Sequence, residues 1–269
     1  MSLPTLLALM LLTAPAPGEP APRRELPKGL DSAPWEELWV DQCKEKLTAA
    51  GLTEHFYFSR RNRLEERKLY KHDPIYCHVP QGAVWTRGPT GVRYYGFTMF
   101  NCAMSLAMTR FEKIAQEEAH RIFGTKSEQP ITAIRHLGTY NCRRLREKPD
   151  KQSQHSFGNA IDLAGFYIRG VGNVDVQKHW TARWPSLQKR QDFLRALVVR
   201  LREEQVFTNV LDPTWDTAHD NHLHVDLAAL SDGLPSPALA RTMGMPVTAA
   251  GEPGGDAGTT AGTTGPAHD

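Results

Sequence analysis

The chain has 269 residues, enough for one domain with a hydrophobic core, and its formal net charge at pH 7 is only +2. This near-neutral balance argues against a nucleic-acid-binding surface, and no apolar run is long enough to anchor the chain by spanning a bilayer. The four cysteines include no CxxC pair, which excludes zinc ribbons and thioredoxin-type motifs.

The two ends of the chain are expected to lie outside the folded domain. Residues 1–18 hold an apolar run followed by small residues and prolines, which is typical of a secretory signal peptide. A disordered N-terminal arm is the alternative, because no Lys or Arg precedes the apolar run. Residues 19–33 are expected to be a linker, and the Pro/Gly/Thr-rich segment 232–269 has too little apolar surface to fold. The folded domain is therefore expected at residues 34–231, in a protein exported to the periplasm or the cell exterior.

Apolar residues at helical spacing predict three helices in this domain. The first covers residues 34–51. The second covers residues 101–124, where Asn101 is expected to cap the N-terminus and Gly124 to end the helix. The third covers residues 185–205, whose apolar positions predict one face turned toward a core.

Strands are predicted between and after these helices. Residues 53–96 mix prolines and glycines with apolar residues, which favours short strands and loops. Longer strands are expected at 131–140 and 160–168, and two further strands at 206–211 and 223–227. Since strands and helices do not alternate regularly, the pattern predicts an α+β fold with a small antiparallel sheet packed against helices.

The chain has four cysteines: Cys43, Cys77, Cys102 and Cys142. An even number favours two disulfides in an exported protein. Three connectivities are possible, and the sequence does not decide among them. We favour Cys43–Cys77 together with Cys102–Cys142.

Two short segments carry the residue types of a metal site. In SQHSFGNAID, His155 stands seven positions before Asp162. In DNHLHVD, His222 and His224 are two positions apart, so on a strand they point to the same side and can approach one ion. Two imidazoles and one carboxylate are ligands that catalytic zinc uses, with its fourth position left to water. No HExxH motif is present, so a zinc hydrolase here has a different design.

Histidines and tryptophans also have a plain structural interpretation. Histidines on strands are usually hydrogen-bonded residues, and an HxH pair alone is a weak signal of metal binding. His120 and His136 lie beside apolar residues, and we expect core or rim positions for both. His219 lies close to the second segment but receives no role. Three tryptophans are expected in the core rather than in a substrate wall: Trp180, Trp184 and Trp215.

Three segments resemble the bacterial extensin-like C-terminal domain: 138–143 (GTYNCR), 153–166 (SQHSFGNAIDLAGF) and 219–226 (HDNHLHVD). That domain is similar in turn to the superfamily of lysostaphin, D-alanyl-D-alanine metallopeptidases and hedgehog. The resemblance covers about residues 43–227 and is specific in these three segments. The chain departs from the pattern at residues 203–205, where a further cysteine is expected, so no disulfide scheme is carried over.

The resemblance implies that His155, Asp162 and His224 bind Zn²⁺. His222 is then the unliganded histidine beside the bound water, suited to accept a proton or, when protonated, to hydrogen-bond the oxyanion. Asp220 is the competing base, because some relatives use a carboxylate just upstream of the last ligand.

Three further residues receive roles from the same comparison. Arg143 is similar to the arginine that contacts a substrate carbonyl or carboxylate in related peptidases, with a surface salt bridge as the alternative. Ser153 and Asp226 are expected to orient ligand side chains through hydrogen bonds, or else to be ordinary turn and strand residues.

Together these expectations describe an exported zinc peptidase, a carboxypeptidase or an endopeptidase, that acts on peptidoglycan stem peptides or cross-links. His222 or Asp220 manages the proton, and zinc with Arg143 stabilises the oxyanion. The rival is a non-catalytic cell-wall or partner-binding module with a structural zinc, since hedgehog-like relatives show that this scaffold need not be a peptidase. An unliganded histidine in place of a fourth Cys or His ligand favours catalysis.

Overall fold

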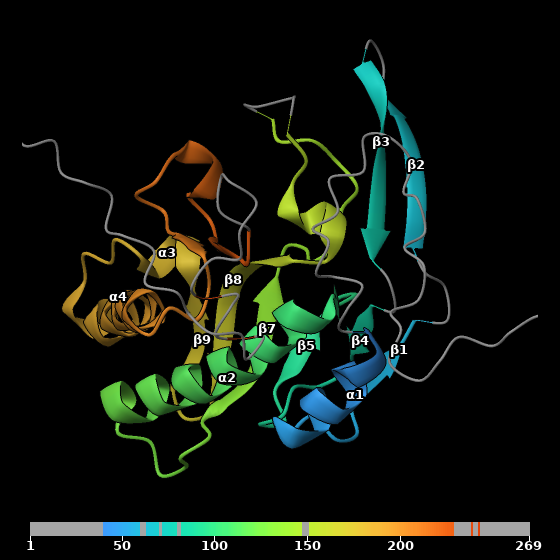
Figure 1. Ribbon diagram of the computed structural model, residues 1–269. Coiled ribbons are helices and arrows are strands. Elements are labelled where there is room, and N and C mark those ends of the chain that lie inside the picture. The colour runs from blue at the N-terminus through green and yellow to red at the C-terminus, as the bar shows by residue number, and fades with distance from the viewer. Residues whose placement is uncertain are drawn as a thin grey trace, which may run out of the picture.

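A computed structural model describes residues 40–59, 63–69, 72–79, 82–146 and 151–228, together with Ala238 and Thr242 (Figure 1). The expected signal peptide and linker, and the expected tail apart from those two residues, lie outside the described residues. Among the helices that are described, none combines the length and the hydropathy needed to cross a membrane.

The elements follow in the order α1 (Val40–Ala49), β1 (Phe56–Phe58), β2 (Arg63–Leu69), β3 (His72–Val79), β4 (Ala83–Trp85), β5 (Arg93–Tyr95), β6 (Met99–Phe100), α2 (Cys102–Phe123), β7 (Ile131–His136), η2 (Gln154–Phe157), β8 (Ala160–Ile168), β9 (Gly172–Asp175), α3 (Val176–His179), η3 (Pro185–Leu187), α4 (Gln188–Glu203), β10 (Asn209–Leu211), η4 (Thr217–His219) and β11 (Leu223–Asp226). The elements labelled η are short 3-10 turns. The mixture of helices and strands confirms the α+β class.

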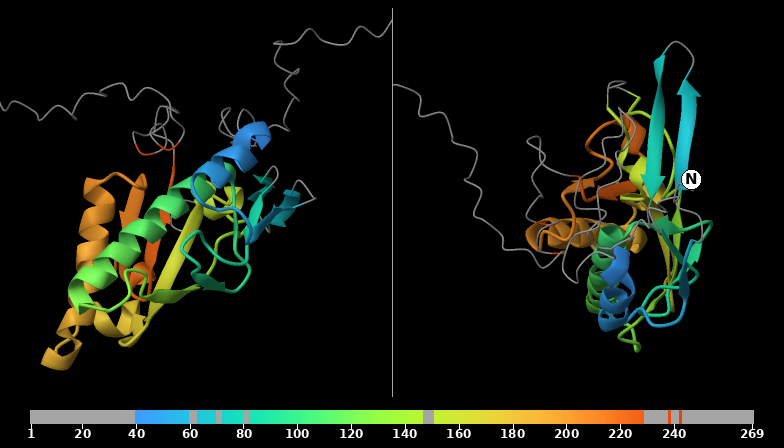
Figure 2. Two further views of the ribbon diagram at one scale, coloured as in Figure 1. Left: turned by 90° about the horizontal axis from the view of Figure 1, so that it is seen from below. Right: turned by 45° about the vertical axis from the view of Figure 1, so that its right-hand side comes forward.

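Helix α2 begins and ends where local capping predicts. The Asn101 side chain accepts a hydrogen bond from the backbone N–H of Met104, and Gly124 ends the helix with φ 63° in the left-handed region. Its apolar face packs on the sheet, where the Phe111 ring lies 6.5 Å from the ring of Phe166 on β8. Phe193 of α4 meets the same Phe166 ring at 5.3 Å, so both helices cover one face of the sheet (Figure 2).

The main sheet has six strands in the order β10-β11-β8-β7-β5, with β9 also paired to β8. Its pairs are antiparallel except β5 with β7, which is parallel. The prediction of a small antiparallel sheet is therefore wrong for this pair. The reason is that α2 lies between the two strands in sequence and returns the chain in the same direction, as parallel pairing requires.

The two faces of β8 have different surroundings. Ile161 and Leu163 are fully buried in the core, so Asp162, which lies between them, points to the face away from α2 and α4. The pairing of β8 with β7 has a register shift between Leu163 and Gly165. Because this shift changes the alternation of sides along β8, Phe166 faces the helices again. A continuous strand thus presents apolar residues to the core and one carboxylate to the opposite face.

Two smaller sheets precede α2. Strands β1, β4 and β6 form a three-stranded sheet, and β2 pairs with β3 as a hairpin that projects from the rest of the domain (Figure 2). Residues 53–96 therefore contain the short strands that the sequence predicts.

The disulfides join Cys43 to Cys102 and Cys77 to Cys142, so the pairing favoured from the sequence is wrong. Helix α1 packs against α2, which brings Cys43 to the first residue of α2. Strand β3 lies against η2, near the loop that holds Cys142. Both bonds join segments far apart in sequence, at separations of 59 and 65 residues.

The remaining expected elements are present. The helix expected at 34–51 is α1, and residues 34–39 of that range lie outside the described residues. Strand β8 has the predicted ends, whereas the strands expected at 131–140 and 206–211 end or begin several residues inside those ranges. The helix expected at 185–205 starts with the 3-10 turn η3 before α4 begins. Strand β9 and helix α3 were not predicted, because both are only four residues long.

Candidate metal centre

Three donor side chains converge on the face of the main sheet that is turned away from α2 and α4. His224 of β11 stands directly opposite Asp162 of β8 in the strand pairing, and His155 comes from the turn η2. One donor atom of each residue lies within 4.8 Å of the other two. The three residues therefore form a group able to hold a metal ion, and they are the three that the resemblance implies.

The distances within this group suit a small tetrahedral ion. Asp162 Oδ1 lies 3.2 Å from His155 Nε2 and 2.8 Å from His224 Nδ1. Ligand atoms bound to one tetrahedral zinc ion at its usual bond lengths stand about 3.4 Å from each other. A zinc ion would therefore need only small movements of these side chains, and the donor set fits it.

Hydrogen bonds outside the group orient both imidazole rings. His155 Nδ1 lies 3.3 Å from the carbonyl oxygen of Thr139, and His224 Nε2 lies 3.0 Å from Asp226 Oδ2. Asn209 donates in turn to Asp226 Oδ1 at 2.8 Å. Each ring thus directs one nitrogen toward Asp162 and uses the other nitrogen to stay in place.

Ser153 supports the backbone that carries His155. Its side chain accepts a hydrogen bond from the His155 backbone N–H at 3.4 Å and so caps η2. Gly158 ends the turn with φ 60°, and a Cβ there would lie only 3.1 Å from the backbone nitrogen of Asn101. The turn is therefore held at both ends by residues that the sequence motif contains.

The environment sets opposite charges within the group. Burial raises the pKa of Asp162, but hydrogen bonds with His155 and His224 outweigh it and hold that pKa well below its ordinary value. Burial lowers the pKa of His224, yet hydrogen bonds with Asp162 and Asp226 raise it to about 9. Without an ion, a proton on His224 therefore balances the Asp162 carboxylate, and a bound cation would take the place of that proton.

His222 stands beside the group without being one of the three donors. Its Nδ1 lies 2.7 Å from Asn221 Oδ1, and its Nε2 lies 3.4 Å from Asp162 Oδ1. Burial lowers the pKa of His222 below its ordinary value, which favours the neutral ring at pH 7. Asp220 is exposed, and among the described residues its side chain makes no hydrogen bond or ion pair. The choice between these two residues as the base stays a prediction.

His219 and Asp216 are close neighbours of the group that sequence reasoning did not include. His219 Nδ1 lies 2.6 Å from Asp216 Oδ1, and the His219 ring is in contact with the rings of His222 and His224. The signal in the sequence was an Asp three residues before a His at the start of a turn, which predicts an N-cap.

Arg143 is anchored through its backbone, next to η2. Ser156 Oγ accepts from the Arg143 N–H at 3.0 Å and donates to the Arg143 carbonyl at 2.9 Å. Within the described part of the chain, its guanidinium meets no carboxylate and reaches only the Arg144 carbonyl, at 3.5 Å. The salt bridge considered from the sequence is therefore not present among these residues.

His136 and His120 lie at core or rim positions, as expected. His136 is largely buried on β7, where its Nε2 lies 2.9 Å from Thr98 Oγ1 and burial lowers its pKa to about 4. His120 lies near the end of α2, with its Nδ1 3.1 Å from the carbonyl of Ser127.

The tryptophan prediction is correct for Trp180, which is buried, and wrong for two others. Trp184 and Trp215 are 71% and 66% exposed. Each belongs to a turn, Trp184 before η3 and Trp215 after β10, where the chain has left the packed layers.

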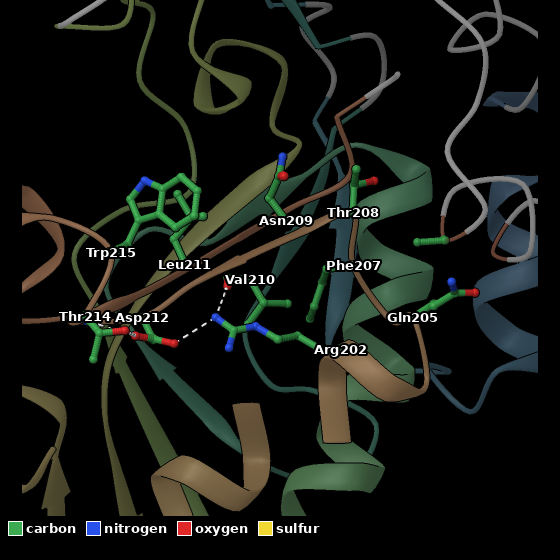
Figure 3. Close-up of a pocket in the computed structure, with 11 residues that line it drawn as sticks. Arg202, Gln205, Phe207, Thr208, Asn209, Val210, Leu211, Asp212, Thr214 and Trp215 are labelled. Carbon is green, nitrogen blue, oxygen red and sulfur yellow. Dashed lines mark hydrogen bonds and ion pairs between the residues drawn. The ribbon is translucent and has the colours of Figure 1, made fainter. Parts of the chain in front are cut away.

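A cavity of about 700 Å³ lies along the edge strand β10 (Figure 3). Its lining includes Leu211, Trp215 and Arg202, whose guanidinium donates to Val210 O and to Asp212 Oδ2, each at 2.7 Å. None of the three donor residues lines this cavity, which is beside the candidate centre rather than over it.

Comparison with known proteins identifies the family of the chain. The family model of the extensin-like protein C-terminus matches residues 42–234, well over half of the chain. The chain therefore belongs to the extensin-like C-terminal family. No curated protein and no solved structure matches it.

Proposed function

We propose that this extensin-like chain is an exported, zinc-dependent peptidase that acts on peptidoglycan stem peptides or their cross-links. The observation that carries the proposal is the convergence of one carboxylate and two imidazoles, with donor atoms within 4.8 Å of each other. Beside them, His222 is a further imidazole that the group does not need as a ligand. A structural zinc site would be expected to use a fourth protein ligand in that place.

His155, Asp162 and His224 would hold the zinc ion. The ion supplies a Lewis acid that lowers the pKa of a bound water and polarises a scissile carbonyl. The carbonyl of Thr139 and the Asp226 carboxylate keep the two imidazoles turned toward Asp162 before any ligand binds. This preorganisation is what an efficient site requires, since the rings need only small movements.

His222 is suited to handle the proton, because its ring is neutral at pH 7 and lies next to the donor group. Asp220 is the competing residue for this role. Arg143 is proposed to bind a substrate carbonyl or carboxylate, for which its planar set of donors is suited.

The substrate class rests on the similarity of the motifs to the superfamily of lysostaphin and the D-alanyl-D-alanine metallopeptidases. Two disulfides support the proposed export to the periplasm or cell exterior, because such bonds persist in oxidising compartments.

The test combines metal analysis with digestion of purified peptidoglycan followed by mass spectrometry. We expect one zinc per chain and cleaved peptides from the wild type, zinc without cleavage from His222→Ala, and neither from His224→Ala. His55→Ala is the matched control, because His55 is exposed and lies in the loop before β1. Asp220→Asn separates the two candidate bases.

Two outcomes would contradict the proposal. Stoichiometric zinc without cleavage of any wall peptide would support the non-catalytic module, in which zinc has a structural role. A chain that binds no zinc would rule out the peptidase.

A further inference from the structure

His219 lies at the rim of the candidate metal centre. Its ring centroid is 5.1 Å from that of His222 and 5.9 Å from that of His224. Its side chain keeps 18% of its surface exposed, whereas that of His155 keeps 3%. His219 therefore packs against the outer side of two imidazoles that belong to the site.

Asp216 holds His219 in this position. Its Oδ1 accepts from the backbone N–H groups of Ala218 and His219 at 2.8 and 3.1 Å, and lies 2.6 Å from His219 Nδ1. One carboxylate thus caps the turn η4 and fixes the ring that the turn carries. With Nδ1 turned to Asp216, the rest of the His219 ring is placed against its neighbours.

His222 depends on such support. Asn221 Oδ1 lies 2.7 Å from His222 Nδ1, which leaves Nε2 facing Asp162 Oδ1 at 3.4 Å. One hydrogen bond at the ring edge does not fix the plane of an imidazole. The contact with the His219 ring, inclined at 44°, supplies the second constraint. The two residues also share a turn, since the His222 N–H donates to the His219 carbonyl at 3.4 Å.

We propose that His219, held by Asp216, is a positioning residue that keeps the ring of His222 directed at the metal centre. The inference rests on the proposed function, in which His222 manages the proton. In this arrangement Asp216 acts on His222 through His219, and the exposed Asp220 takes no part in the positioning.

Four variants separate positioning from general stability. His219→Ala removes the ring. Asp216→Ser keeps a side chain that caps η4 but is too short to hold His219 Nδ1, whereas Asp216→Asn keeps an oxygen at the same reach. Thr217→Ala is the control, because Thr217 is exposed on the same turn.

For His219→Ala and Asp216→Ser we expect kcat to fall by about 10-fold, the usual cost of losing a supporting partner, with KM changed by less than about 2-fold. Asp216→Asn should recover at least half of the wild-type kcat, and zinc content should stay at one per chain in all variants. In NMR spectra of the zinc-loaded protein, the contacts between the rings of His219 and His222 should be present in the wild type and Asp216→Asn but lost in Asp216→Ser.

Wild-type kcat in both His219→Ala and Asp216→Ser would overturn the inference. A loss that follows the melting temperature and is not recovered in Asp216→Asn would also overturn it, since that pattern marks a purely structural role. If the wild type cleaves no wall peptide, the proposed function fails by itself. The ring contacts then decide the positioning: their persistence in Asp216→Ser overturns it, and their loss supports it.

Discussion

Two carboxyl groups withdrawn from water, Asp162 on β8 and Glu112 on α2, have their pKa values shifted in opposite directions. Imidazoles surround Asp162, and their hydrogen bonds hold its pKa well below the ordinary value despite burial. Hydroxyl and amide donors surround Glu112: Tyr94 Oη at 2.6 Å, Thr90 Oγ1 at 2.8 Å and the Thr90 backbone nitrogen at 3.1 Å. Burial then prevails and raises the pKa of Glu112 to about 7.

The two sites show that the partners of a buried carboxyl group decide whether the effect of burial on its pKa is overcome. Imidazoles can carry a positive charge and so stabilise the Asp162 anion, which is the form that binds a cation. Neutral donors only partly offset the desolvation of Glu112, which therefore serves to join α2 to residues 90–94. The first group has the properties of a ligand and the second those of a structural hydrogen-bond partner.

The largest expected effect is on metal binding. Asp162→Asn removes the only anion among the three proposed zinc ligands. We expect zinc affinity to fall by about 1,000-fold or more, which is ~4 kcal/mol. Competition with a fluorescent chelator measures this loss. Glu112→Gln is the matched control and should bind zinc as the wild type does; an equal loss there would erase the contrast between the two groups.

Removal of the other carboxyl group should affect folding instead. Glu112→Ala leaves the buried Tyr94 hydroxyl and the Thr90 N–H without their acceptor and opens a cavity, so we expect about 3–4 kcal/mol of destabilisation. Urea unfolding of the zinc-free protein measures it. Lys113→Ala, at the exposed neighbouring position of α2, should cost less than about 0.5 kcal/mol. A comparable cost for Lys113→Ala would show that the helix, not the carboxyl group, is responsible.

The pH dependence of stability follows from the raised pKa of Glu112. Because the folded-state pKa of about 7 exceeds the ordinary value of 4.5, the folded protein keeps this proton when the unfolded chain has lost it. The contribution is complete below about pH 4.5 and is lost as the pH rises through 7, with a total of about 3 kcal/mol. Subtracting the unfolding free energies of Glu112→Gln from those of the wild type across pH 4–8 isolates it. A difference that does not change with pH would show that Glu112 titrates normally.

The smallest effect concerns the support of a ligand. Asp226→Asn keeps an acceptor for His224 Nε2 but removes its charge, and we expect zinc affinity to fall by about 10-fold. The chelator competition used for Asp162→Asn measures the change. Asp192→Asn, on α4 away from the centre, should leave the affinity unaltered. A loss as great as that of Asp162→Asn would mean that Asp226 is itself a ligand.

Some of the fold was predictable from a few neighbouring residues. Helix α2 has the predicted bounds because Asn101 and Gly124 act on the backbone within one turn of themselves. Strand β8 was predictable because residues 160–168 form an apolar run interrupted only by Asp162, whose side of the strand the structure then shows. The two motifs gave four candidate donors by residue type and spacing, and the resemblance to the extensin-like domain implied which three of them are the ligands.

Features that depend on contacts between residues far apart in the sequence were not predicted correctly. The favoured disulfide pairing was wrong because Cys43 meets Cys102 only through the packing of α1 on α2. The parallel pairing of β5 with β7 depends on the path of the helix between them.

The order of the residues was enough to identify the candidate metal donors, the ends of the longest helix and the resemblance to an extensin-like domain. Helix capping and the alternation of apolar and polar residues depend on a few neighbouring positions, and donor chemistry depends on the residue type alone. All three can therefore be read from the sequence. The tertiary structure alone decided how the cysteines pair, which imidazoles touch, and whether a buried carboxyl group carries a charge. Those properties depend on distances between residues such as Asp162 and His224, which the chain separates and only the sheet brings together.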